Sequence, residues 1–279
     1  MDKKELQNPA LYTNRELSWL LFNKRVLSEA RDKQLLLFER LKFLSITASN
    51  LDEFFMVRIG SLVDMIHAEY TKKDIAGMSA KEQLDALMEE THKFAALQYS
   101  TYNRMLLPQL RANGLNFVEH HEQLTERQAQ YVDEYFEENV YPVLTPMAVD
   151  SSRPFPLIRN KTLNIGALVA KKGEKDTEIE FATVQVPSVL PRVVRIPAAK
   201  EGDTEVAVLL LEEIIERNIS KLFLNYNVLC AHPFRITRNA DLAIDEDEAE
   251  DLLLEIEKQI KKRTWGQAIR LEIEAAADR

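Results

Sequence analysis

The most informative stretch of the sequence is Asn50-Leu51-Asp52-Glu53-Phe54-Phe55-Met56-Val57-Arg58-Ile59-Gly60. It follows one apolar helix-like run and opens another, so the pattern predicts the N-terminus of a helix with polar side chains in its first turn. Locally this is a capping box, with Asn50 as N-cap and Glu53 three residues later. The free N–H groups of a helix N-terminus also suit an anionic or nucleotide ligand, so a binding role stays open beside the cap.

Helical periodicity extends on both sides of this stretch. Before it, residues 17–27 and 35–46 carry apolar side chains at helical spacing, and Asn14 is placed to cap the first of these helices. After it, the predicted helices continue through a long run at residues 81–110, and Gly114 is a suitable C-terminal stop. Residues 1–114 are therefore predicted to form an all-helical bundle.

The sequence pattern changes in residues 115–279, where strand-like runs appear beside helical ones. A helix is predicted at residues 125–140, and a proline-rich segment follows it. Strand-like runs and two further helices come next. The strands are expected at residues 163–170, 180–186, 192–196, 231–236 and 268–273, and the helices at residues 209–224 and 246–262. Strands grouped with flanking helices predict an α+β domain with a largely antiparallel sheet.

Composition narrows the class of protein. Residues 1–114 carry 16 Lys and Arg against 15 Asp and Glu, whereas residues 115–279 carry 20 against 30. Such an acidic second half disfavours nucleic acid as a partner. The single cysteine, Cys230, fits a reducing compartment, and neither a secretory signal nor an apolar run of about 20 residues is present. We expect a cytoplasmic protein without a transmembrane segment.

Familiar catalytic motifs are absent. The seven glycines are widely separated, so neither a Walker loop nor a G-x-G-x-x-G fingerprint can be written. The five histidines show no H-E-x-x-H spacing, and only one cysteine is present, so we expect no metal ligands and no catalytic residue in this chain. The acidic run at residues 245–251 lacks the glycine of a calcium-binding loop, and its position favours an interaction with a helix dipole.

Arg58 stands out because it falls within the apolar stripe of the predicted third helix. A buried arginine needs a partner, since an unpaired charge in a core is costly. The structural interpretation is an ion pair with Glu16 or Asp52. The functional interpretation is a phosphate contact, since a guanidinium group matches phosphate oxygens.

Several segments together resemble the large bacterial polyphosphate kinases. They keep their order and cover nearly the whole chain, although Arg153 stands where the family usually has a histidine. The matching segments are Asn14-Arg15-Glu16-Leu17-Ser18-Trp19, Glu39-Arg40-Leu41-Lys42-Phe43-Leu44, Asn50–Gly60, Pro142-Val143-Leu144-Thr145-Pro146, Arg153-Pro154-Phe155-Pro156 and Phe234-Arg235-Ile236-Thr237-Arg238-Asn239-Ala240-Asp241.

The resemblance implies an enzyme that makes inorganic polyphosphate reversibly from ATP through a phosphohistidine. It implies four domains, of which this chain matches a helical N-terminal domain (residues 1–114) and a dimerising head domain (residues 115–279). The phosphohistidine and the Mg²⁺ ligands are then expected in the missing catalytic domains, so the chain alone is expected to be inactive. Asn50 matches the family asparagine that contacts ATP, and an amide can both donate to and accept from an adenine edge.

Partners follow from the same resemblance: ATP or ADP, polyphosphate, the missing catalytic domains, and a second copy through the head domain. An alternative of another class also stays open. A non-catalytic interaction or regulatory protein could have kept this scaffold and lost the chemistry.

Overall fold

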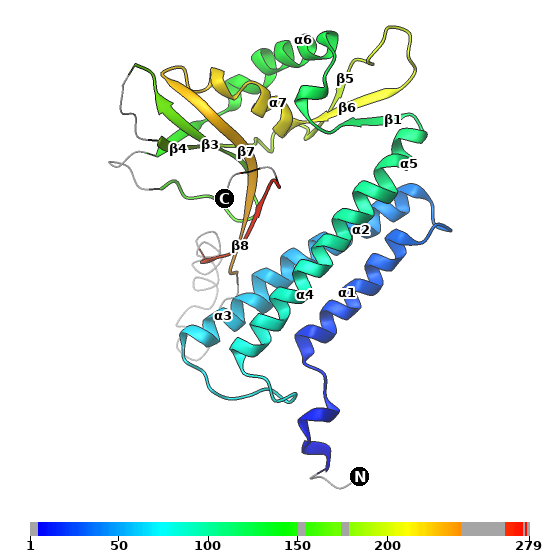
Figure 1. Cartoon of the computed structure of the whole chain (residues 1–279), viewed down its shortest axis with the longest axis vertical. Helices are drawn as coiled ribbons and strands as arrows, with labels where there is room; N and C mark the ends of the chain where they lie inside the picture. The colour runs from blue at the N-terminus through cyan, green and yellow to red at the C-terminus, as the bar shows by residue number, and fades with distance from the viewer. Residues whose placement is uncertain (1–4, 150–154, 174–178, 241–265, 276, 278–279) are drawn as a thin grey trace, which may run out of the picture. The chain divides into compact units, whose positions relative to one another are not determined.

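The structure is a computed structural model and describes residues 5–149, 155–173, 179–240, 266–275 and 277 (Figure 1). It divides into two compact units. The helical unit comprises Met1–Gln109 and Thr237–Arg270, and the sheet unit comprises Leu110–Ile236 and Leu271–Arg279. The domain boundary after Gly114 stays a prediction. The helix predicted at residues 246–262 and the acidic run at residues 245–251 lie outside the described residues.

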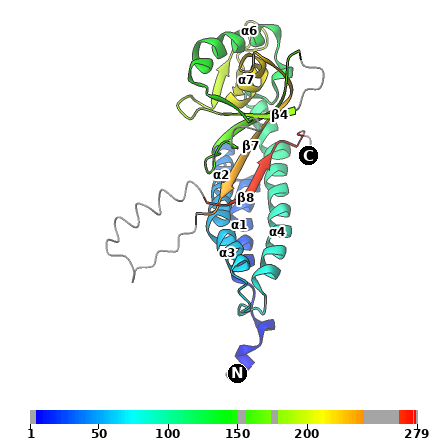
Figure 2. The same cartoon turned by 90° about the vertical axis from the view of Figure 1, so that its left-hand side faces the viewer.

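The helical unit is built from long helices that lie side by side. Both cartoons show α1, α2 and α4 running alongside one another (Figures 1 and 2). The elements are α1 (Arg15–Arg31), α2 (Leu37–Phe54), a π-helical segment (Phe55–Ile59), α3 (Gly60–His67), α4 (Ala80–Thr101), a second π-helical segment (Tyr102–Leu106) and α5 (Leu107–Ala112), whose last residues belong to the sheet unit.

Local sequence explains where these helices begin. The Asn14 side chain accepts hydrogen bonds from the N–H groups of Glu16 and Leu17, which confirms it as the N-cap of α1. Ser79 and Glu82 form a capping box at the start of α4. Between the helices, a core of fully buried apolar side chains includes Leu27, and the rings of Trp19 and Phe54 stack at 4.5 Å.

One local prediction is wrong. Asn50 is not an N-cap, because α2 continues through it to Phe54 and the helical path runs on to His67. No glycine or proline separates the two predicted helices, so nothing in the sequence stops the first one. The Asn50 amide meets a side chain of α1 instead of capping its own backbone.

The sheet unit contains two sheets. One has three strands in the order β1-β6-β5, and five strands form the other in the order β2-β4-β3-β7-β8. The strands are β1 (Leu115–Val118), β2 (Pro146–Val149), β3 (Leu163–Lys171), β4 (Ile179–Gln185), β5 (Val193–Ile196), β6 (Val206–Leu210), β7 (Tyr226–Arg238) and β8 (Ala268–Ile273). The last residues of β7 and the first of β8 belong to the helical unit.

The predicted fold class is confirmed, since a helical region precedes an α+β region. In that region β1 pairs with β6 in parallel, and the pairs β2–β4, β3–β4, β3–β7 and β5–β6 are antiparallel. The helix expected at residues 209–224 is shorter in the structure. Its first two residues belong to strand β6 (which ends at Leu210), and only α7 (Leu211–Arg217) is α-helical. Strands β1, β2 and β6 were not predicted. Each is only four or five residues long, which leaves little periodicity to read.

Two helices complete the sheet unit. The helix α6 (Glu126–Tyr135) starts at the Thr125 cap, and α7 packs against β3 and β6. The core between helices and sheets contains fully buried side chains such as Phe136, Ile165 and Ile214. Among the described helices, none combines the length and apolarity that crossing a bilayer requires.

Candidate functional site

Asn50 lies on α2, where a polar network between helices fixes its side chain. Its Nδ2 donates to Asn23 Oδ1 at 3.1 Å, and Asn23 Nδ2 donates to the Thr47 carbonyl at 3.1 Å. Asn23 is fully buried, whereas Asn50 is half-buried. Within the described residues Asn50 Oδ1 accepts no hydrogen bond, so an oriented amide oxygen is left for a donor from outside the network.

Asp52, which lies in the Asn50–Gly60 stretch, pairs with Arg270. Arg270 Nη1 lies 3.5 Å from Asp52 Oδ1, and the Arg270 guanidinium lies 4.9 Å from the centre of the Phe55 ring. Asp52 is therefore not the partner of Arg58, although the sequence offered it as one. Arg58 Nε instead lies 3.9 Å from Glu16 Oε2, which was the other predicted partner.

Arg58 is also less buried than its place in the apolar stripe predicted. Its side chain is 48% exposed and lies at the edge of a pocket of about 360 Å³. The π-helical segment that contains Arg58 changes the angular spacing of the helix, which shifts this residue away from the core stripe. Arginine at a solvent-filled edge is available to a ligand, which arginine in a sealed core is not.

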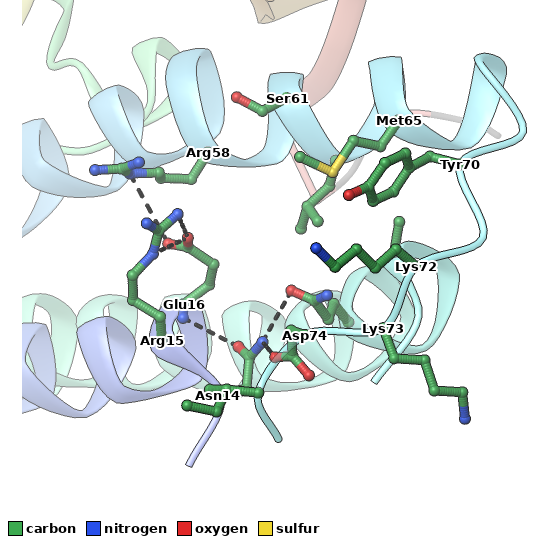
Figure 3. Close-up of a pocket in the computed structure, with 14 residues that line it drawn as sticks. Asn14, Arg15, Glu16, Arg58, Ser61, Met65, Tyr70, Lys72, Lys73 and Asp74 are labelled. Atoms are coloured by element: carbon green, nitrogen blue, oxygen red, sulfur yellow. Dashed lines mark hydrogen bonds and ion pairs between the residues drawn. The ribbon is translucent and has the colours of Figure 1, made fainter. Parts of the chain in front are cut away.

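Basic side chains dominate this pocket (Figure 3). Arg15 and Arg58 lie over Glu16, and Lys72 points into the hollow while Lys73 points away from it. The full lining is Asn14, Arg15, Glu16, Arg58, Ser61, Leu62, Met65, Tyr70, Lys72, Lys73, Asp74, Ile75, Ala80 and Gln83. Apart from Lys73, the lining holds three cations (Arg15, Arg58 and Lys72) and two carboxylates (Glu16 and Asp74), so the pocket favours an anion.

The floor of the pocket is rigid because of Asn14. Its Nδ2 donates to Asp74 Oδ2 at 2.7 Å and to Gln83 Oε1 at 2.8 Å, while its Oδ1 caps α1. Asn14 is 3% exposed, so one buried amide joins the start of α1 to α4 and to the loop that carries Lys72. A pocket fixed in this way loses little entropy when it binds a ligand.

Residues that follow β7 contact the π-helical segment and α3. Ala240 N donates to the Met56 carbonyl at 2.9 Å, and Asn239 Nδ2 donates to Asp64 Oδ2 at 2.9 Å. A Cβ atom on Gly60 would lie 2.3 Å from Asn239 Oδ1, so the Asn239 side chain can keep this position only beside a glycine. The Asn50–Gly60 stretch and the Phe234–Asp241 segment, which were matched to one family separately, thus meet at these residues.

Comparison with known proteins decides the family. The model "Polyphosphate kinase N-terminal domain" matches residues 12–118, and "Polyphosphate kinase middle domain" matches residues 127–279. The chain belongs to the polyphosphate kinase family. Both predicted regions of the resemblance are therefore confirmed as parts of this family.

Relatives agree with this assignment. The polyphosphate kinase of Halalkalibacterium halodurans is 48% identical over 271 residues, which is 97% of this chain and 38% of that protein. Polyphosphate kinase 1 of Chlorobaculum tepidum is 41% identical over 96% of this chain and 38% of its own length. The crystal structure of polyphosphate kinase from Porphyromonas gingivalis superposes with a TM-score of 0.72 at 28% identity, over 90% of this chain and 38% of that one.

The two predicted site residues lie on one helical path but not in one pocket. Arg58 lines the basic pocket, and Asn50 does not. Sequence reasoning missed Arg15 and Lys72 as pocket residues, although the adjacent cations Lys72-Lys73 in a loop were a visible signal. Among the described residues, the groups with metal-ligand spacing all lie in the sheet unit, away from these residues in sequence.

Proposed function

We propose that this chain is the N-terminal and head region of a polyphosphate kinase that transfers the ATP γ-phosphate reversibly to inorganic polyphosphate. The observation that carries the proposal is the ordered match of two polyphosphate kinase domain models along the chain. The chain spans 38% of the curated relatives' length, so the phosphohistidine and the Mg²⁺ ligands belong, in this proposal, to the part outside the chain. Alone, the chain is then catalytically silent.

Asn50 contributes to the ATP site in this proposal. Its Nδ2 is held by Asn23 and its Oδ1 is open to a donor, which is what contact with an adenine amino group requires. Asn23 is buried and bonded to backbone, so the Asn50 amide is preorganised and little rotamer entropy is lost on binding.

Arg58 has a different role in the proposal. It contacts a phosphate group in the basic pocket, with Arg15 and Lys72 beside it. Glu16 holds the Arg58 guanidinium from one side and leaves its other donors for the ligand. The head domain supplies the surface of a cytoplasmic homodimer.

The test of the ATP contact uses the full-length kinase. Asn50→Ala should raise the KM for ATP by about 10-fold, since a hydrogen bond to the base contributes about 1.4 kcal/mol. Asn50→Asp keeps an acceptor oxygen but loses the donor to Asn23, so it separates loss of the ligand contact from loss of orientation. Ser49→Ala, an exposed change one residue earlier on α2, is the matched control. Unchanged kinetics in Asn50→Ala with a folded protein would remove Asn50 from the site.

The role of the fragment is tested with γ-labelled ATP. The chain is incubated alone and with the catalytic remainder of the kinase, and labelled polymer and acid-labile phosphoprotein are measured. Label only after mixing supports the proposal. Label with this chain alone would contradict it, and no label in either mixture would favour the non-catalytic scaffold.

A further inference from the structure

A cluster of histidines and glutamates in the sheet unit is not used by the proposed kinase function. Atoms of His121, Glu213 and Glu216 that can bind a metal lie within 4.8 Å of one another, and so do those of Glu216, His232 and Glu274. Glu216 belongs to both groups. The residues come from the turn before α6, from α7, from β7 and from the segment after β8, so only the folded chain brings them together.

The contacts within the cluster are close. His232 Nδ1 lies 2.7 Å from Glu274 Oε2 and 3.9 Å from Glu216 Oε1. His121 Nδ1 lies 3.3 Å from Glu213 Oε2, and the His121 N–H donates to the same oxygen at 2.9 Å. The Glu213 and Glu216 side chains are only 9% and 13% exposed, so these two carboxylates are largely shielded from solvent.

Negative charge is in excess at this point. Within the described part of the chain, Glu213, Glu216 and Glu274 form ion pairs only with histidines, whereas neighbouring Glu212 pairs with Arg192. His120, 3.7 Å from Glu213, and Glu122, 3.6 Å from His121, also face the cluster. Buried carboxylates without arginine or lysine need another positive charge.

The protonation behaviour agrees with this charge excess. Burial, with the neighbouring carboxylates of Glu213 and Glu274, raises the pKa of Glu216 to about 8. Burial also raises the pKa of Glu213, although hydrogen bonds from His121 oppose the change. A raised pKa favours the neutral form of these carboxyl groups.

We propose that this cluster binds a divalent transition-metal ion of the Zn²⁺ class, with Glu216, His232 and Glu274 as its ligands. Imidazole nitrogen mixed with carboxylate oxygen suits Zn²⁺ better than Mg²⁺, which prefers oxygen and water. His121 and Glu213, which are bonded to each other, lie beside Glu216. The ion joins α7, β7 and the segment after β8. Sequence spacing predicted no metal site, because the ligands are far apart along the chain.

The test is calorimetric titration of the whole chain with ZnCl₂ after treatment with a chelator, with MgCl₂ in a parallel titration. One equivalent of Zn²⁺ should bind, and Mg²⁺ should bind more weakly. His232→Ala and Glu216→Gln should each weaken Zn²⁺ binding by at least about 10-fold, and His121→Ala by less. His232→Gln serves if His232→Ala does not fold.

The matched control is His92→Ala, since His92 is an exposed histidine on α4 in the helical unit. It should leave Zn²⁺ affinity unchanged. A thermal shift gives a second readout, because Zn²⁺ should raise the Tm of the wild-type chain and not that of Glu216→Gln. No saturable Zn²⁺ binding, or binding that survives in both His232 and Glu216 variants, would overturn the proposal.

Discussion

The basic pocket and the histidine–glutamate cluster place their charges in opposite ways. In the helical unit, Arg15, Arg58 and Lys72 lie around two carboxylates, and each carboxylate is already bonded to a neighbour. In the sheet unit, three carboxylates meet histidines and, among described residues, no lysine or arginine. A net charge of −9 therefore says little about local ligands, because the same chain holds one group of cations suited to an anion and one group of carboxylates suited to a cation.

The largest expected effect is a loss of stability when Gly60, the first residue of α3, is replaced. Gly60→Ala places a Cβ atom 2.3 Å from Asn239 Oδ1, so the Asn239 side chain must turn away and give up its hydrogen bond to Asp64. We expect a loss of about 2–3 kcal/mol in the free energy of unfolding. Urea denaturation measures it. Gly202→Ala, where no atom lies within 4 Å but φ is +89°, should cost only about 1 kcal/mol. Equal costs for both would show that the close approach is unimportant.

The next effect lies in the cluster of the sheet unit. The folded-state pKa of Glu216 is about 8, well above 4.5, so its contribution to stability is complete below pH 4.5 and is lost as pH rises toward 8. Glu216→Gln imitates the neutral form. With chelator present, the variant should therefore be more stable than wild type by about 1–2 kcal/mol at pH 8 and equally stable near pH 4.5. Thermal unfolding at both pH values checks this, and a variant less stable at pH 8 would contradict it.

A smaller effect is expected for the anion preference of the pocket. Arg58→Ala removes one of its cations and should weaken binding of tripolyphosphate to the whole chain by about 10-fold, or 1.4 kcal/mol. Titration calorimetry at fixed ionic strength measures the affinity. Arg25→Ala is the control, since Arg25 is exposed on α1 and lies outside the pocket. Similar losses for both variants would mean that the effect is only one of net charge.

The smallest effect concerns the ion pair between Arg217 and Asp133. Arg217 Nε and Nη2 donate to Asp133 at 2.8 and 3.0 Å. Burial raises the pKa of Asp133, but Arg217 and Asn218 outweigh it and lower the pKa below its usual value. The pair therefore stabilises above the unfolded-state pKa and loses its effect as pH falls through the folded-state pKa.

Asp133→Asn should accordingly cost about 0.5–1 kcal/mol at pH 7 and almost nothing in strong acid, because the carboxylate is partly solvated. Urea unfolding at the two pH values measures the difference. A cost that persists at low pH would point to lost packing rather than lost charge.

Much of the local structure could be read from the sequence. Asn14 caps α1, β8 spans the predicted residues 268–273, and the α+β class is confirmed. The errors share a cause. Asn50 has the right neighbours for a cap, but no glycine or proline stops the helix before it, and its amide bonds to Asn23 on another helix. Leu209 and Leu210 begin the predicted helix 209–224, but in the structure they end strand β6. Strands β1 and β5, from other parts of the chain, pair with them there.

The candidate site shows the same limit. Arg58 was identified, and Glu16 was one of its two predicted partners, because both residues belong to recognisable segments. The remaining pocket residues come from three separate parts of the chain, and no local pattern links them. The place of Arg58 at an edge rather than in a core depends on a π-helical turn, which sequence periodicity does not reveal.

Residue order, periodicity and short-range hydrogen bonds were enough to predict the family and several helices with their starts, such as α1 and α6. Which charges meet depends on the tertiary structure. Glu216 and His232 are neighbours because α7 and β7 pack in one unit, and Arg270 reaches Asp52 across most of the chain. Each residue fixes the chemistry of its own side chain. Which side chains come together depends on the packing of the whole unit, and no short stretch of sequence specifies that packing.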